Sequence, residues 1–137
     1  MLFLRAVSVA LIVIGSSLLA SAQQPPLNDS VIVEQLISKS PWKGAYTSIR
    51  SAGALEIVFS KPDKELLGLI QNSATNSYFN LNGPVRFLSV KNGLVEFETS
   101  DATFALRIDS SGKLAGNLTS KRFRSNPLPV VVLSPSQ

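Results

Sequence analysis

The sequence predicts an all-β protein: an antiparallel meander barrel of eight or nine strands with a short N-terminal helix. Three observations predict this fold. From residue 41 onwards, apolar and polar side chains alternate with the period of two that is typical of β-strands. Turn-forming residues interrupt the alternation at intervals of roughly ten residues, as in sandwiches and barrels. Gly44, Gly68 and Gly116 would face inward, and such glycines let a small sheet bend tightly enough to close.

The first 22 residues have the pattern of a cleaved signal peptide. Arg5 precedes an apolar run over residues 6–20, and Ala20-Ser21-Ala22 is the small-x-small pattern that signal peptidase cleaves. Cleavage after Ala22 predicts a secreted or periplasmic protein with no integral membrane span. An uncleaved membrane anchor is the alternative, although the run is shorter than the roughly 20 residues that a spanning helix needs.

Composition excludes several classes of chemistry. The chain has no histidine and no cysteine, which excludes an imidazole base, a Ser-His-Asp triad, thiolate catalysis and His- or Cys-ligated metals. We therefore expect no enzyme activity, no cofactor and no metal. Without Arg5 the chain has 13 − 1 = 12 Lys+Arg against 9 Asp+Glu, a net charge of +3. Because no run of basic residues accompanies this weak charge, we expect no nucleic-acid partner.

A helix is predicted between Asn28 and Pro41. Residues 28–30 offer side-chain oxygens for an N-cap, and Pro41 ends the helix. Its apolar residues share one face: Ile32, Val33, Leu36 and Ile37. So short a helix must dock on other elements to be stable, so we expect it to cover an open barrel end, with a mobile arm as the alternative. The predicted division is a signal peptide at 1–22, a linker and helix at 23–40 and a barrel domain at 41–137.

Nine segments with strand periodicity follow. The segment at 65–71 is apolar on both faces, which predicts a central strand, and 82–84 forms a turn. Asn92-Gly93 predicts a type I′ hairpin turn because both residues tolerate a positive φ. Prolines bracket the last segment, which predicts an edge or closing strand. The predicted strands are 42–47, 54–59, 65–71, 78–81, 85–90, 94–99, 103–108, 114–118 and 130–133.

Several of these patterns together resemble a known family. They are Trp42-x-Gly44-x-Tyr46, the L-x-G-x-I form of residues 66–70, the Gly112/Leu114/Gly116 spacing and the proline-bracketed apolar run at 127–133. This combination, covering about residues 41–134, is similar to the lipocalin-like (calycin-type) small β-barrel module of exported bacterial proteins. The resemblance implies the barrel fold but no particular ligand. The lipocalin Gly-x-Trp order is reversed here, and the lipocalin disulfides are missing.

Inward-facing aromatic side chains are the first candidate site. The residues expected to point inward are Trp42, Tyr46, Leu55, Ile57, Phe59, Leu67, Leu69, Phe87, Phe97, Phe104, Leu106 and Leu114. Five of them are predicted to contact a small apolar or amphipathic ligand at the barrel mouth: Trp42, Tyr46, Phe59, Phe87 and Phe104. The alternative is that they simply fill the interior, as in other small barrels. If the five residues do contact a ligand, the protein is predicted to be an exported non-enzymatic binding module.

The basic loop is the second candidate site. Lys121, Arg122 and Arg124 surround Phe123, and such a group can hold an anion while the aromatic ring stacks on a sugar or base. This loop predicts, as the alternative function, contact with a protein or an anionic component of the cell envelope. A solvated loop without function is the simpler interpretation.

Two carboxylate patterns raise a third hypothesis, a carboxylate-dependent hydrolase. Glu96 and Glu98 would lie about 7 Å apart on one strand face, near the separation of an inverting glycosidase pair. A solvated outer face explains them more simply. Residues 109–112, Asp-Ser-Ser-Gly, superficially resemble an aspartic protease motif, but their position between two strands predicts a turn.

Overall fold

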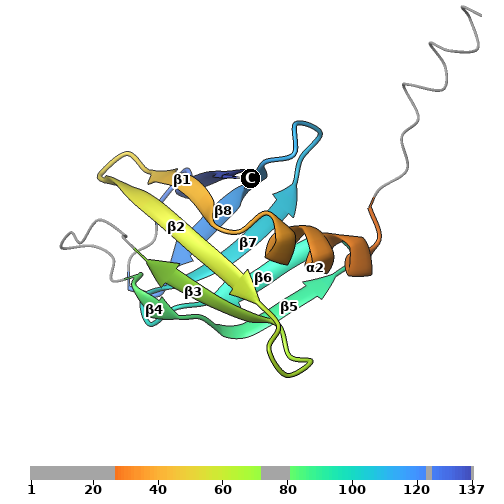
Figure 1. Ribbon diagram of the computed structural model, residues 1–137. Helices are drawn as coiled ribbons and strands as arrows, with labels where there is room; N and C mark the ends of the chain where they lie inside the picture. The colour runs from red at the N-terminus through yellow and green to blue at the C-terminus, as the bar shows by residue number, and fades with distance from the viewer. Residues whose placement is uncertain (1–26, 72–80, 123–124, 137) are drawn as a thin grey trace, which may run out of the picture.

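A computed structural model describes residues 27–71, 81–122 and 125–136. The described part is a nine-strand antiparallel sheet, nearly closed into a barrel, with one short helix before the first strand (Figure 1). The predicted fold class is therefore confirmed. The predicted signal peptide lies outside the described residues. The elements are α2 (Asp29–Ser38), β1 (Trp42–Thr47), β2 (Ala52–Ser60), β3 (Leu67–Gln71), β4 (Gly83–Pro84), β5 (Arg86–Lys91), β6 (Leu94–Glu98), β7 (Ala102–Ile108), β8 (Leu114–Ser120) and β9 (Val130–Pro135).

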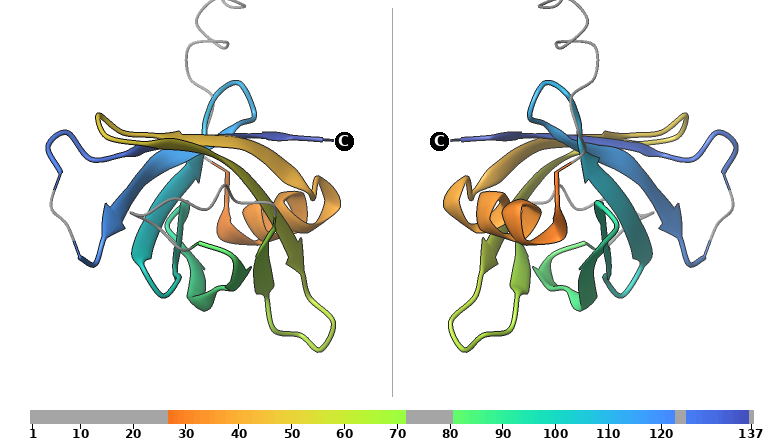
Figure 2. Two further views of the ribbon diagram at one scale, coloured as in Figure 1. Left: turned by 90° about the vertical axis from the view of Figure 1, so that its left-hand side faces the viewer. Right: turned by 90° about the vertical axis from the view of Figure 1, so that its right-hand side faces the viewer.

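The strands form an up-and-down meander in the order β4-β3-β2-β1-β9-β8-β7-β6-β5. Each strand pairs with the next strand along the chain except at the β4–β5 junction, and β9 also pairs with β1. The last strand thus joins the first, and Figure 2 shows the sheet curving around the interior. β9 lies in the middle of the strand order, so it is a closing strand and not an edge.

The barrel seam is bridged by a single stretch of chain. Pro84 pairs with β3, and the Val85 amide donates to the Gly68 carbonyl at 3.0 Å. The next residues, beginning with Arg86, pair with β6 instead. The side chains of Val85 and Leu88 both lie close to Gly68 on the inner side. Side-chain packing and one kinked segment therefore complete the wall where strand pairing stops.

A β-bulge in this segment reverses the expected side-chain phase. The register shifts between Arg86 and Ser89, and Phe87 has a φ of +55°, in the left-handed region. Leu88 and Val90 pack against the core, whereas Phe87 is 77% exposed. The prediction that Phe87 points inward is therefore wrong, because the extra residue in the bulge turns its side chain to the outer face.

Replacing Phe87 with glycine should leave the free energy of unfolding unchanged or raise it by up to about 1 kcal/mol. A left-handed φ costs a non-glycine residue roughly 1–2 kcal/mol, and glycine removes this cost. Part of the gain is offset because glycine loses more backbone entropy on folding. Urea denaturation followed by circular dichroism measures the change. Phe104→Ala is the control: this side chain is fully buried, and its truncation should cost about 3–5 kcal/mol. A similar loss for Phe87→Gly would contradict the outward orientation.

The remaining inward pattern is largely confirmed. On β2, Leu55, Ile57 and Phe59 are all at most 2% exposed. Phe97 stacks on Phe104 with 4.6 Å between ring centroids, and Phe59 meets Phe97 edge-on at 6.5 Å. Strand alternation therefore placed these aromatic rings correctly on the inner face.

Strand β3 departs from the prediction. Gly68 and Ile70 are buried, but Leu67 and Leu69 point outward, 44% and 38% exposed. β3 is the second strand from one end of the order, and only two residues of β4 pair with its outer edge. It is thus not central, and its second apolar face remains on the surface. The predicted strand at 78–81 lies mostly outside the described residues, and the predicted turn at 82–84 contains β4.

Helix α2 docks against one end of the barrel, as expected. The Asn28 side chain caps it, accepting the Val31 amide at 2.9 Å. Ile32 and Leu36 are buried in the core, and the helix contacts β2 and β5. The indole N–H of Trp42 donates to the Leu36 carbonyl at 3.0 Å. This bond ties the helix C-terminus to the first strand, so α2 is part of the packed structure and not an arm.

Two of the predicted inward glycines mark very close approaches between strands. A Cβ atom on Gly44 would overlap the backbone carbonyl oxygen of Val132 in β9. A Cβ atom on Gly116 would overlap the carbonyl oxygen of Ala105 in β7 in the same way. At Gly68 the nearest atom is a side-chain methyl of Val85, at 2.9 Å. The sharp coiling of the sheet therefore depends on glycine at positions 44 and 116.

Candidate functional site

Four of the five predicted ligand-binding residues are packed into the core. Trp42, Tyr46, Phe59 and Phe104 are at most 2% exposed and belong to one continuous cluster. Almost none of their surface is open to a ligand at the barrel mouth in this conformation. The fifth, Phe87, lies on the outside of the barrel. The arrangement of these side chains favours a filled interior over a hollow one.

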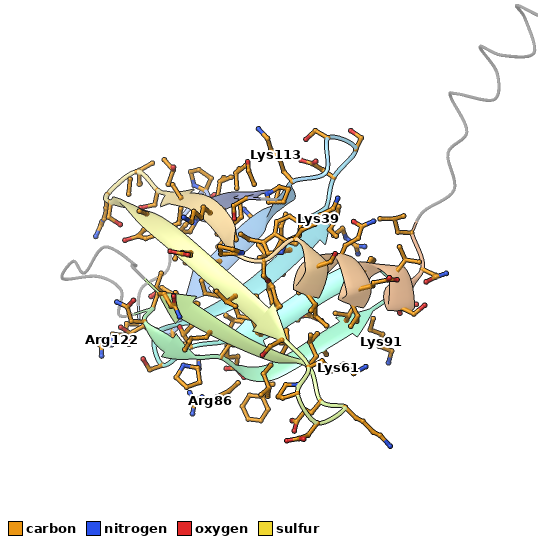
Figure 3. All side chains as sticks on the ribbon, viewed as in Figure 1. Lys39, Lys61, Arg86, Lys91, Lys113 and Arg122 are labelled. Atoms are coloured by element: carbon orange, nitrogen blue, oxygen red, sulfur yellow. The ribbon has the colours of Figure 1, made fainter. Side chains whose placement is uncertain are left out.

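The described cations of the basic loop are engaged in internal contacts. Lys121 Nζ lies 2.8 Å from a Glu98 carboxylate oxygen and 2.9 Å from the Thr99 carbonyl. Arg122 Nη2 lies 3.3 Å from the carboxylate of Asp101, which is largely buried. Phe123 and Arg124 lie outside the described residues. The cations labelled in Figure 3 are spread around the molecule, so they form no single basic face.

Glu96 and Glu98 lie two residues apart on the outer face of β6. Glu96 is paired with Ser89 and Glu98 with Arg86 in the register of the sheet. Glu98 forms its ion pair with Lys121. A glycosidase pair flanks a substrate cleft, whereas these carboxylates border only a shallow hollow of about 220 Å³. The geometry favours a solvated face.

The Asp-Ser-Ser-Gly motif forms the turn between β7 and β8. The Asp109 carboxylate accepts the Ser111 hydroxyl at 2.6 Å and the amides of Ser111 and Lys113 at 2.9 and 3.0 Å. The Ser111 hydroxyl, followed by the Lys113 amide, lowers the pKa of Asp109 below its usual value. These contacts explain the motif as turn chemistry, because Asp109 closes the turn with its own side chain.

A cleft of about 680 Å³ lies outside the barrel, between the start of α2 and the β5–β6 turn. Figure 1 shows the end of β5 beside the first turn of the helix. We call this hollow the helix–hairpin cleft. Its wall includes the apolar residues Leu27, Ile32 and Ile108. Its full lining is Leu27, Asn28, Asp29, Ile32, Asn92, Gly93, Arg107 and Ile108.

Hydrogen bonds hold the two sides of the helix–hairpin cleft together. The Asp29 carboxylate accepts the backbone amides of Asn92 and Gly93 at 3.0 and 2.8 Å. From the other side, Arg107 Nη1 donates to the Asn92 carbonyl at 3.0 Å. Asn92 and Gly93 have φ values of +53° and +80°, which confirms the predicted turn. The cleft therefore has a defined shape, set by a turn that is bonded from both sides.

Sequence reasoning missed this site, although parts of it had visible signals. Asn92-Gly93 was recognisable as a hairpin turn and Asp29 as a candidate helix cap. Arg107, between the apolar residues Leu106 and Ile108, could be placed on an outer strand face from the alternation. Nothing in the sequence showed that the helix start and the hairpin turn, 63 residues apart, would meet.

The described part of the chain is thus a small antiparallel β-barrel with one helix and a cleft between the helix start and the β5–β6 turn. Comparisons with models of protein families, with curated proteins and with solved structures found no match for this chain. In the described ranges, no three acidic side chains gather closely enough to hold a metal ion. Across the same ranges, no helix combines the length and the hydrophobicity of a membrane span.

Proposed function

We propose that this protein is an exported, non-enzymatic binding module that holds a small apolar or amphipathic ligand in the helix–hairpin cleft. The cleft itself carries the proposal. Its volume of about 680 Å³ falls within the range of small-molecule sites, roughly 300–1,000 Å³. Such sites combine apolar side chains with polar groups that orient the ligand, and this cleft has three apolar residues beside Asp29 and Arg107. Under this proposal the ligand lies in the cleft and not among the buried aromatic side chains of the interior.

The packing of the interior supports this choice of site. A ligand at the mouth would have to displace Trp42 or Tyr46, both fully buried. The nearly closed meander is compatible with the lipocalin-like (calycin) type, which we infer from the Trp42-x-Gly44-x-Tyr46 pattern and the glycines. In this protein the outside of such a barrel would serve as the ligand site.

Export and the lack of catalysis rest on the sequence. The apolar run at 6–20 and the Ala20-Ser21-Ala22 pattern support cleavage after Ala22 and a secreted or periplasmic location. The absence of histidine and cysteine removes the most common nucleophiles and bases. The outer-face position of Glu96 and Glu98 adds no support for a hydrolase.

A second candidate function is contact with a protein or envelope partner. Phe87 favours it, because a 77% exposed aromatic in the left-handed region is unusual and such strain is common at functional sites. The basic loop supports it less, since Lys121 and Arg122 already contact carboxylates. If the folded protein binds no small ligand, contact with a protein or envelope partner remains as the candidate function.

The test uses the chain expressed with its own amino-terminal segment and purified after export. Dodecanoate, dodecanol and dodecylamine, below micelle-forming concentrations, serve as probes in isothermal titration calorimetry. We expect at least one of them to bind. Leu27→Glu, which places a charge on the apolar wall, should weaken that binding at least tenfold. Mass spectrometry of the purified protein checks the export. A mass that matches a chain beginning at Gln23 would support it, and a mass that includes residues 1–22 would contradict it.

Leu128→Glu is the matched control for Leu27→Glu. Leu128 is 42% exposed against 43% for Leu27, and it does not line the cleft. Its binding should equal that of the wild type. Absence of binding by all three probes, or equal weakening by both variants, would overturn the proposed site.

A further inference from the structure

The anionic group of the helix–hairpin cleft already accepts a hydrogen bond on each of its two oxygens. One carboxylate oxygen of Asp29 accepts the Asn92 amide at 3.0 Å, and the other accepts the Gly93 amide at 2.8 Å. Both oxygens thus serve the turn and hold the helix to the hairpin. A cationic ligand group would have to compete with these two bonds. The negative charge of the cleft is therefore poorly placed to attract a ligand.

The cationic group of the cleft is largely unused. A guanidinium has five N–H donors, and Arg107 directs one nitrogen, Nη1, to the Asn92 carbonyl at 3.0 Å. Neither of the ion pairs described above, those of Lys121 and Arg122, involves Arg107. Arg107 is also exposed, so its remaining donors are accessible from the cleft.

The guanidinium of Arg107 lies close to the apolar wall of the cleft. Nη1 lies 3.1 Å from the point where a Cβ atom of Gly93 would sit, and Ile32 Cδ1 lies 4.0 Å from the same point. The cation and the apolar wall therefore both lie close to Gly93. A molecule in the cleft would meet an apolar surface and a cation within one short distance. This pairing of surfaces matches an amphiphile with a negative head group.

We propose that the ligand of the helix–hairpin cleft is an amphiphile with a carboxylate head group, which pairs with Arg107 while its apolar tail lies against Leu27, Ile32 and Ile108. The planar guanidinium fork matches a carboxylate, and charge-assisted hydrogen bonds are stronger than neutral ones. The inference rests on the proposed function and adds the chemical class of the ligand.

The test compares three probes with one tail and different head groups: dodecanoate, dodecanol and dodecylamine. We expect dodecanoate to bind at least tenfold more tightly than either of the others. Arg107→Gln should abolish the preference, so that the variant binds dodecanoate no more tightly than it binds dodecanol. Lys91→Gln is the matched control, because it removes the same charge from the residue before the turn, and it should change binding less than threefold.

The outcomes separate the two proposals. If dodecanol binds as tightly as dodecanoate and remains sensitive to Leu27→Glu, the carboxylate proposal fails and the proposed function stands. Equal effects of Lys91→Gln and Arg107→Gln would also overturn it, since the charge would then act only at long range. If no probe binds, both proposals fail. If Arg107→Gln does not fold, the wild-type protein supplies the test: added salt must weaken the binding of dodecanoate but not that of dodecanol. Dodecanoate binding that does not change with salt would overturn the inference.

Discussion

Alanine at Gly44 or Gly116 is expected to destabilise the protein by about 3 kcal/mol or more, near the upper end of overpacking effects. The added Cβ atoms would overlap the carbonyl oxygens of Val132 and Ala105. These are backbone atoms of neighbouring strands, so they cannot move away by a change of rotamer. The strands would have to separate, which breaks ladder hydrogen bonds on both sides. Urea unfolding followed by the fluorescence of Trp42 measures the loss.

Gly68→Ala is the graded control for this prediction. The same added atom would meet a methyl group of Val85 at 2.9 Å, and a side chain can shift. Its cost should be clearly smaller than at the other two glycines. Ala45→Gly, on the outer face of β1, should cost only about 0.5–1 kcal/mol from chain entropy. Losses below 1 kcal/mol at both Gly44 and Gly116 would show that closure does not depend on them.

Truncating Trp42 to alanine is the second large effect, with an expected loss of about 3–5 kcal/mol. The side chain is fully buried between the helix end and the barrel interior. Its indole N–H also donates to the Leu36 carbonyl at 3.0 Å, and the same carbonyl accepts the Ser40 hydroxyl at 2.7 Å. The variant therefore loses packing and loosens the attachment of α2. Because Trp42 is the only tryptophan, unfolding must be followed by circular dichroism.

Trp42→Phe separates the two contributions. Phenylalanine keeps most of the apolar volume but cannot donate to Leu36, so its cost should be smaller, about 1–2 kcal/mol. If Trp42→Ala and Trp42→Phe were equally destabilising, the hydrogen bond to the helix would dominate. A loss below 1 kcal/mol in the alanine variant would contradict the buried position of the ring.

Strand alternation predicted the interior well wherever both neighbouring strands were regular. Trp42 and Tyr46 on β1, and Phe104 and Leu106 on β7, are all buried as expected. The reason is that each strand must bury one face, and the period of two leaves only one choice once that face is apolar. Asn92-Gly93 was equally readable, because few residue pairs accept two positive φ values.

The misassigned residues lie at the seam of the barrel. Phe87 was expected inside because its neighbours alternate regularly in sequence, but a bulge shifts the phase by one residue. Leu67 and Leu69 suggested a strand covered on both faces, yet both side chains are exposed on the outer side of β3. Local periodicity reports neither the extra residue in a bulge nor whether another element covers the second face of a strand.

The candidate site was the least predictable feature. Asp29 and Arg107 are each unremarkable in sequence, a capping residue and an outward strand residue. They line one cleft only because the helix folds back onto the turn at Asn92 and Gly93. The meeting of these groups depends on how the whole sheet coils, so it could not be inferred from their spacing.

The amino-acid sequence by itself determined the all-β class, most of the turn positions, most of the inward faces and the exclusion of histidine and cysteine chemistry, because these depend on local residue type and period. The tertiary structure alone decided how the barrel closes, which apolar residues stay outside and where a cleft forms. These features arise from contacts between distant segments, and such contacts are set by the curvature of the complete sheet and by the docking of α2 against it.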